Sequence, residues 1–79
     1  VMHMNIKRLK EIRERKGLFQ KDIAKLLNTT QQVYSEYELG VRLIPLDKID
    51  KLASFYDVSV DYLINRTDEK KPYPNKKEH

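Results

Sequence analysis

The sequence predicts an all-α domain built from five short helices. Apolar residues recur at helical spacing in five segments, and no segment shows the strict alternation of a half-buried strand. Glycine or proline stands between several of these segments, where a helix is expected to end or begin. The 79 residues suffice for one small domain with a thin core.

The first three helices are expected to cover about residues 5–16, 20–27 and 31–39. Their apolar faces carry Ile6, Leu9, Ile12, Ile23, Ala24, Leu27, Tyr34 and Tyr37. Gly17 and Gly40 are placed to end the first and third helices. Asn28 lies in the turn after the second helix, where a left-handed backbone conformation is expected and asparagine tolerates it. Ala24 is small where the second and third helices must approach each other.

The third helix is expected to begin at Thr29 or Thr30 as its N-cap. Thr29 with Gln32 would form a capping box, which contributes about 1 kcal/mol. If the two tyrosines anchor this helix to the core, the polar side chains that point outward are Gln31, Gln32, Ser35 and Glu36.

The second half of the chain predicts two more helices. The fourth is expected over about residues 45–56, with Pro45 in its first turn and an apolar face of Leu46, Ile49, Leu52, Ala53 and Tyr56. Ser59 is expected to cap a short fifth helix, with Val58 and Leu63 as a hydrophobic staple. The domain is thus expected over 5–66. Residues 1–4 are expected to be disordered or cloning-derived, and 67–79 a flexible polar tail.

Composition excludes several classes of function. The chain has no cysteine, which excludes disulfides and thiolate metal sites. No apolar run approaches the roughly 20 residues that span a bilayer, and no signal peptide is recognised, so a cytoplasmic, nucleoid-associated protein is expected. The aspartates lack the spacing of a calcium loop, and no nucleophile or phosphate-loop motif is present. We therefore expect no enzyme, metal, cofactor or small-molecule ligand.

Charge is distributed unevenly along the chain. Residues 5–17 hold six basic and two acidic side chains, residues 18–44 hold three of each, and residues 45–65 hold two basic and four acidic ones. Such a pattern can reflect ordinary solvated helix faces. It also fits a domain with one side turned toward a polyanion and an acidic side turned away.

The segment from Gly17 to Gly40 carries most of the functional information. It predicts two short helices joined by a tight turn, and the second helix begins with Thr29-Thr30-Gln31-Gln32. A glutamine amide can pair bidentately with a base edge. These side chains could also be a plain polar surface, but the agreement of turn, small residue and tyrosine anchors favours sequence-specific DNA binding.

This segment resembles the helix-turn-helix of the phage repressor and Cro family, also called the XRE family, over roughly residues 5–66. The resemblance rests on Arg13, Gly17, Leu18, Gln20, Ile23, Ala24, Thr30, Gln31, Gln32, Ser35, Glu38, Gly40 and Pro45, with the later run YDVSVDYLINRTD. It implies a compact five-helix, lambda-repressor-like domain with the helix-turn-helix at the second and third helices.

The resemblance also implies roles for individual residues. Base reading falls to Gln31, Gln32 and Glu36, where either glutamine could pair with adenine. The acidic Glu36 departs from the commonest family pattern and would either accept from cytosine N4 or repel phosphate in wrong registers. Phosphate contacts are expected from Gln20, Lys21, Thr30, Ser35 and Arg42, and Arg42 could instead contact the minor groove. Arg13 and Glu38 are expected to form a partly buried structural salt bridge.

The function expected from these features is that of a transcriptional regulator, a repressor in most of the family, which binds a short palindromic operator of double-stranded DNA as a homodimer. The alternative is an antitoxin-like protein-interaction module in which DNA contact is secondary. Prophage repressor, Cro-like switch protein, restriction-modification controller and host regulator all remain open as subtypes.

Overall fold

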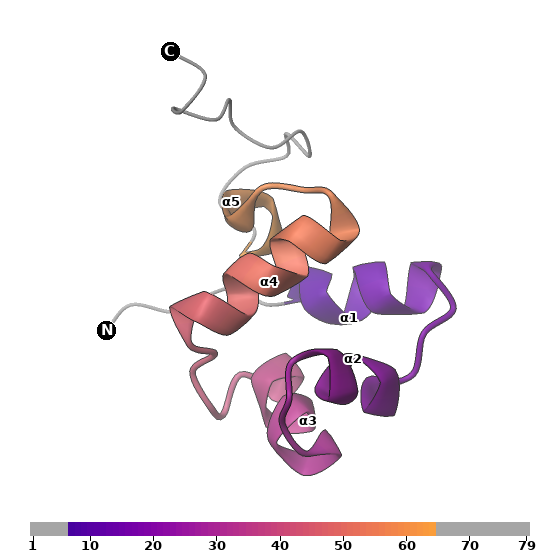
Figure 1. Ribbon diagram of the computed structural model, residues 1–79, viewed down its shortest axis with the longest axis vertical. Helices are drawn as coiled ribbons and strands as arrows, with labels where there is room; N and C mark the ends of the chain where they lie inside the picture. Colours follow the sequence, from indigo (N-terminus) through magenta and orange to yellow (C-terminus); the bar gives the residue numbers. More distant parts are fainter. Residues whose placement is uncertain (1–6, 65–79) are drawn as a thin grey trace.

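The computed structural model describes residues 7–64 and confirms the all-α prediction within them. The five helices are α1 (Lys7–Arg15), α2 (Gln20–Leu26), α3 (Gln31–Leu39), α4 (Leu46–Tyr56) and α5 (Val60–Leu63) (Figure 1). Predicted Ile6, the N-terminal segment 1–4 and the tail 67–79 lie outside the described residues. No helix in the described part of the chain is long and apolar enough to cross a membrane.

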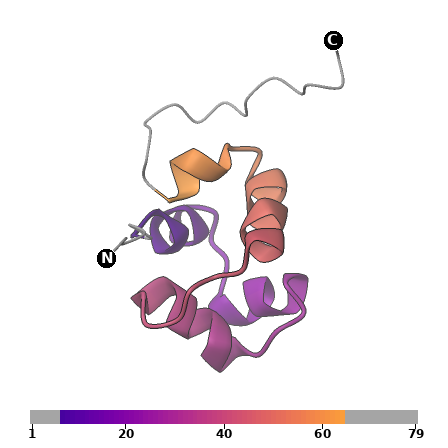
Figure 2. The ribbon, with the colours of Figure 1, turned by 90° about the vertical axis from the view of Figure 1, so that its left-hand side faces the viewer.

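The first helix lies between α5 and the α2–α3 pair. In both views α2 and α3 lie on one side of α1, and α5 lies on the other (Figures 1 and 2). Leu9 and Ile12 of α1 are buried in the core that the helices share. Arg8 attaches α1 to α5, because its guanidinium lies 4.1 Å from the centre of the Tyr62 ring and donates to the Tyr62 carbonyl at 3.3 Å. α1 therefore packs against both α3 and α5.

Left-handed residues end three of the helices and form the central turn. Gly17 has φ 72° and Gly40 has φ 80°, and Asn28 has φ 57° in the turn between α2 and α3, all as predicted. Asp57, for which no left-handed conformation was predicted, ends α4 with φ 59°. Its short polar side chain is one of the few that tolerate this conformation.

The N-cap of α3 is Thr30, one of the two predicted candidates. The Thr30 hydroxyl oxygen accepts from the Val33 N–H at 3.1 Å. The Thr29 N–H instead donates to the Ala24 carbonyl at 2.9 Å, which holds Thr29 at the end of α2. The capping box predicted between Thr29 and Gln32 is therefore wrong.

Two predictions for the start of α4 are also wrong. Pro45 does not lie in the first helical turn, because its extended backbone, with ψ 153°, makes it the N-cap of α4. Leu46 does not belong to the buried face, since 76% of it is exposed, whereas the core residue Leu52 is fully buried. Leu46 is the first residue of α4, and no described element covers this end of the helix.

Two truncations on the same helix test this assignment. Leu52→Ala removes a fully buried side chain and should lower the free energy of unfolding by about 2–5 kcal/mol. Leu46→Ala is the matched control and should change that free energy by no more than about 0.5 kcal/mol. Urea unfolding followed by circular dichroism measures both. Equal losses in the two variants would contradict the exposure of Leu46.

Candidate nucleic-acid interface

Two tyrosines hold α3 in its orientation. Tyr34 and Tyr37 are both buried, and their rings meet edge to face with centroids 6.2 Å apart. On the other side of the turn, the Lys48 ammonium donates to the Leu27 carbonyl at 2.9 Å and so ties α4 to the end of α2. The sequence did not predict this contact. The buried tyrosines turn the opposite face of α3 outward, and the Lys48 bond holds the end of α2 against α4.

The outward face of α3 borders a shallow depression of about 480 Å³. It is lined by Gln20, Gln31, Gln32, Ser35, Glu36 and Leu39. The structure thus brings together the three residues expected to read bases, with two of those expected to contact phosphate. Leu39 was missed, although it is 72% exposed and lies four residues after Ser35, a spacing that places both on one helix face.

A second depression of about 340 Å³ adjoins the first where α2 and α3 begin. Its lining comprises Arg13, Phe19, Gln20, Lys21 and Gln31. Phe19 is exposed and was not predicted to take part; the Lys21 ammonium lies 5.7 Å from the centre of its ring. The two depressions share Gln20 and Gln31, and three of the five expected phosphate contacts line them, namely Gln20, Lys21 and Ser35. Thr30 and Arg42 line neither.

A nearly buried ion pair supports this surface from behind. Arg13 Nε donates to Glu38 Oε2 at 2.7 Å, and Arg13 Nη2 donates to Oε1 at 3.2 Å. The side chains are only 9% and 3% exposed, respectively. Arg13 Nη1 also donates to the Leu18 carbonyl at 2.9 Å. The pair thus connects α1, the loop before α2 and the end of α3.

Gln20 has a structural contact that the sequence did not predict. Its Nε2 donates to Glu38 Oε1 at 3.0 Å, so this amide helps to complete the ion pair. An amide nitrogen carries two N–H groups, so one remains to donate to a phosphate oxygen.

The electrostatics of Glu38 follow from these bonds. Burial alone would disfavour its charge, but hydrogen bonds from Arg13 and Gln20 outweigh burial and hold the pKa of Glu38 below its ordinary value of 4.5. Burial and the neighbouring Glu38 carboxylate raise the pKa of the Tyr34 hydroxyl above its ordinary range. Glu38 is therefore a charged, hydrogen-bonded carboxylate at neutral pH.

Glu36 and Arg42, expected as separate contacts, form an ion pair with each other. Arg42 Nε donates to Glu36 Oε1 at 2.6 Å. The pair is open to solvent, with side-chain exposures of 53% for Arg42 and 26% for Glu36.

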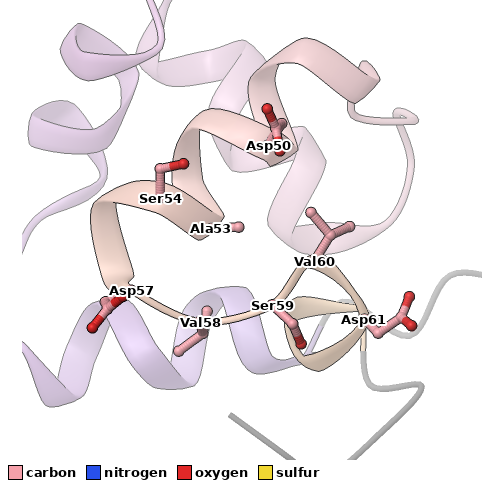
Figure 3. A pocket seen from close by; sticks show the side chains of 8 residues that line it. All are labelled: Asp50, Ala53, Ser54, Asp57, Val58, Ser59, Val60 and Asp61. Carbon is pink, nitrogen blue, oxygen red and sulfur yellow. The ribbon is translucent and has the colours of Figure 1, made fainter. Parts of the chain in front are cut away.

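The far side of the domain is acidic. Asp50, Asp57 and Asp61 border an open depression of about 490 Å³ between α4 and α5 (Figure 3). Within residues 7–64, no group of acidic or histidine side chains is arranged to hold a metal ion. Since like charges repel, this side is unsuited to a polyanion.

The arrangement of α2 and α3, with a tight turn and an exposed polar face on the second helix, is that of a helix-turn-helix protein. A family model described as helix-turn-helix matches residues 9–63. The chain belongs to this family, in its phage repressor and Cro (XRE) branch.

Curated relatives support the same assignment. The chain is 35% identical over 74 residues to YobD, an uncharacterized HTH-type transcriptional regulator of Bacillus subtilis (strain 168). This match covers 94% of this chain and 66% of YobD. It is 40% identical over 65 residues to the HTH-type transcriptional regulator ImmR of the same organism, covering 82% of this chain and 51% of ImmR. The chain therefore spans between half and two thirds of the length of these relatives.

A solved structure shares the fold. The crystal structure of a transcriptional regulator from Listeria innocua superposes with a TM-score of 0.75 at 26% identity. The match covers 82% of this chain and 61% of that one. The predicted five-helix, lambda-repressor-like class is thus shown by both the helices and the neighbour.

The buried ion pair leads to a stability prediction. Glu38→Gln leaves Arg13 without its charge partner and should lower the free energy of unfolding by about 3–5 kcal/mol. Because the pKa of Glu38 is lowered in the fold, its charge stabilises the protein above the ordinary value of 4.5, and this contribution is lost as the pH falls through the folded-state pKa. The difference between wild type and variant should therefore shrink on acidification.

Urea unfolding at a series of pH values measures this difference. Glu14→Gln is the control, since Glu14 is exposed and lies 4.0 Å from the same arginine. A loss of less than about 1 kcal/mol for Glu38→Gln, or a difference that does not vary with pH, would contradict the structural role of the pair.

Proposed function

We propose that this chain is the DNA-binding part or the whole of a transcriptional regulator that reads a specific duplex sequence through the major groove with α3. The observation that carries the proposal is the outward face of α3, where two exposed glutamines lie side by side, Gln31 and Gln32. Asparagine and glutamine are among the few side chains that can both accept from the N6 amino group of adenine and donate to its N7 at one base edge. The fold and the family support the same conclusion.

The proposed contacts fall into two groups. Gln31, Gln32 and Glu36 face the bases, where the glutamines read adenine. Phosphate contacts are proposed for Gln20, Lys21, Thr30, Ser35 and Arg42, and they would fix the domain on the duplex. Arg42 keeps its terminal N–H groups for this purpose, although its Nε is bonded to Glu36.

We further propose that the protein acts as a repressor, in the cytoplasm and without catalysis, and that it binds as a homodimer. One recognition helix of nine residues reads only a few base pairs. A two-fold dimer would double the sequence read, on half-sites about 10 base pairs apart. The acidic α4–α5 side would then face away from the duplex.

One observation favours the alternative of a protein-interaction module. Four large apolar side chains are exposed along the end of α3, the following loop and the start of α4, namely Leu39, Val41, Leu43 and Leu46. Exposed apolar residues that gather in one region mark protein contacts, including a dimer contact. A partner protein bound there, with no sequence preference on DNA, would support the antitoxin-like reading.

Selection from a random pool of duplexes at near-physiological salt distinguishes the DNA-binding regulator from the protein-interaction module. The proposed function predicts enrichment of a palindrome whose half-sites are about one helical turn apart. Recovery of no enriched sequence, with only salt-sensitive non-specific binding, would contradict it.

Removal of one glutamine amide tests direct readout. Gln32→Ala should weaken binding to the selected duplex by about 1–3 kcal/mol and leave binding to an unrelated duplex unchanged. Fluorescence anisotropy with both duplexes measures the two affinities. Ser54→Ala, on the acidic side, is the control and should change neither. An equal loss on both duplexes would remove Gln32 from base recognition.

Removal of one lysine tests phosphate binding. Lys21→Ala should weaken binding to all duplexes and reduce the slope of log K against log salt by about 0.9. The matched control is Lys51→Ala, an exposed lysine on α4. If the slope of the Lys21 variant equals that of the Lys51 variant, Lys21 makes no phosphate contact.

A further inference from the structure

The chain turns back on itself after α3 and brings Arg42 beside Glu36. Gly40 adopts a left-handed conformation with φ 80°, and its N–H donates to the Tyr37 carbonyl at 3.1 Å. The Val41 N–H donates to the Glu36 carbonyl at 3.2 Å, which completes a Schellman-type helix end. The next side chain, Arg42, then reaches Glu36 Oε1 at 2.6 Å. A backbone bond from Val41 and a side-chain bond from Arg42 therefore both hold this loop against Glu36.

The two carboxylates of α3 each have an arginine from outside the helix. The α3 sequence, QQVYSEYEL, contains two glutamates and no basic residue. Arg13 neutralises Glu38, which is buried, and Arg42 neutralises Glu36, which lines the exposed depression. An unpaired carboxylate on a surface that meets phosphates would be repelled by them. Neutralisation by Arg42 removes this repulsion.

The ion pair uses only part of the hydrogen-bonding capacity of Glu36. An ionised carboxylate accepts through two oxygens. Arg42 Nε occupies Oε1, and in the described part of the chain no hydrogen bond to Oε2 is formed. Oε2 is therefore available to a donor that enters the depression. Among the base edges of the major groove, the cytosine N4 amino group is the donor that Glu pairs with.

We propose that Arg42 is a positioning residue for Glu36, and that the Glu36–Arg42 ion pair as a unit selects cytosine at one position of the DNA site. This inference rests on the proposed function and deepens it. Arg42 holds the carboxylate against the reading face and cancels its charge, and Glu36 Oε2 accepts from cytosine N4. Arg42 then affects affinity through Glu36, and this role replaces the independent phosphate contact proposed for it.

A double-mutant cycle tests the unit. The four proteins are wild type, Glu36→Gln, Arg42→Ala and the double variant, with Lys51→Ala as the control for loss of a positive charge. Exposed ion pairs contribute little to stability, so all four are expected to fold, and thermal melts verify this. Affinities are measured for the duplex that wild type selects. They are also measured for the three duplexes that carry another base at the position that Glu36 is proposed to contact.

The proposal predicts strong coupling between the two substitutions. Wild type should prefer cytosine by about tenfold or more over the other bases at one position, and Glu36→Gln and Arg42→Ala should each lose that preference. Arg42→Ala should weaken binding about tenfold when Glu36 is present but less than about threefold in the Glu36→Gln background, since the repelled carboxylate is then gone.

Equal losses from Arg42→Ala in both backgrounds, with a salt slope reduced by about 0.9 in each, would overturn the proposal and leave Arg42 as a simple phosphate contact. A cytosine preference that survives Arg42→Ala would also overturn it. Both outcomes would leave the proposed function intact. If wild type selects no sequence at all, the proposed function itself fails and the pair has no base to read.

Discussion

The buried contact between Arg13 and Glu38 is the interaction on which the functional surface depends. It joins α1 to the last turn of α3, and through the Leu18 carbonyl and the Gln20 amide it also includes the chain that leads into α2. Because apolar contacts are non-directional, a thin core constrains the relative angle of three short helices less than a directional bond does. A charged, bidentate hydrogen-bonded pair has a defined geometry. It therefore holds α3 at a set angle to α1 and α2.

The polar face of α3 follows from this constraint. With Tyr34 and Tyr37 buried and Glu38 held by Arg13, the helix has only one rotation available, and Gln31, Gln32 and Glu36 must face outward. The same network draws Gln20 toward Glu38 and so places the start of α2 beside the start of α3. The structural contacts and the proposed base contacts are thus coupled, because α3 carries the residues of both.

Much of this arrangement could be predicted from local sequence. Gly17, Asn28 and Gly40 occupy left-handed positions because few other residues adopt them at low cost, and such preferences are visible without a structure. Other features could not be predicted. The choice of Thr30 over Thr29 as N-cap depended on a bond from Thr29 to Ala24, and the exposure of Leu46 depended on where the core ends.

The sequence by itself determined the all-α class, the order of the five helices, the turn between α2 and α3 and the outward glutamines, because periodicity, glycine and asparagine act over a few residues. Only the tertiary structure decided several other polar contacts. Gln20 bonds to Glu38, Lys48 to the end of α2, and Arg42 to Glu36 rather than standing alone. Such partnerships depend on how segments are brought together in space, and sequence spacing alone does not specify that.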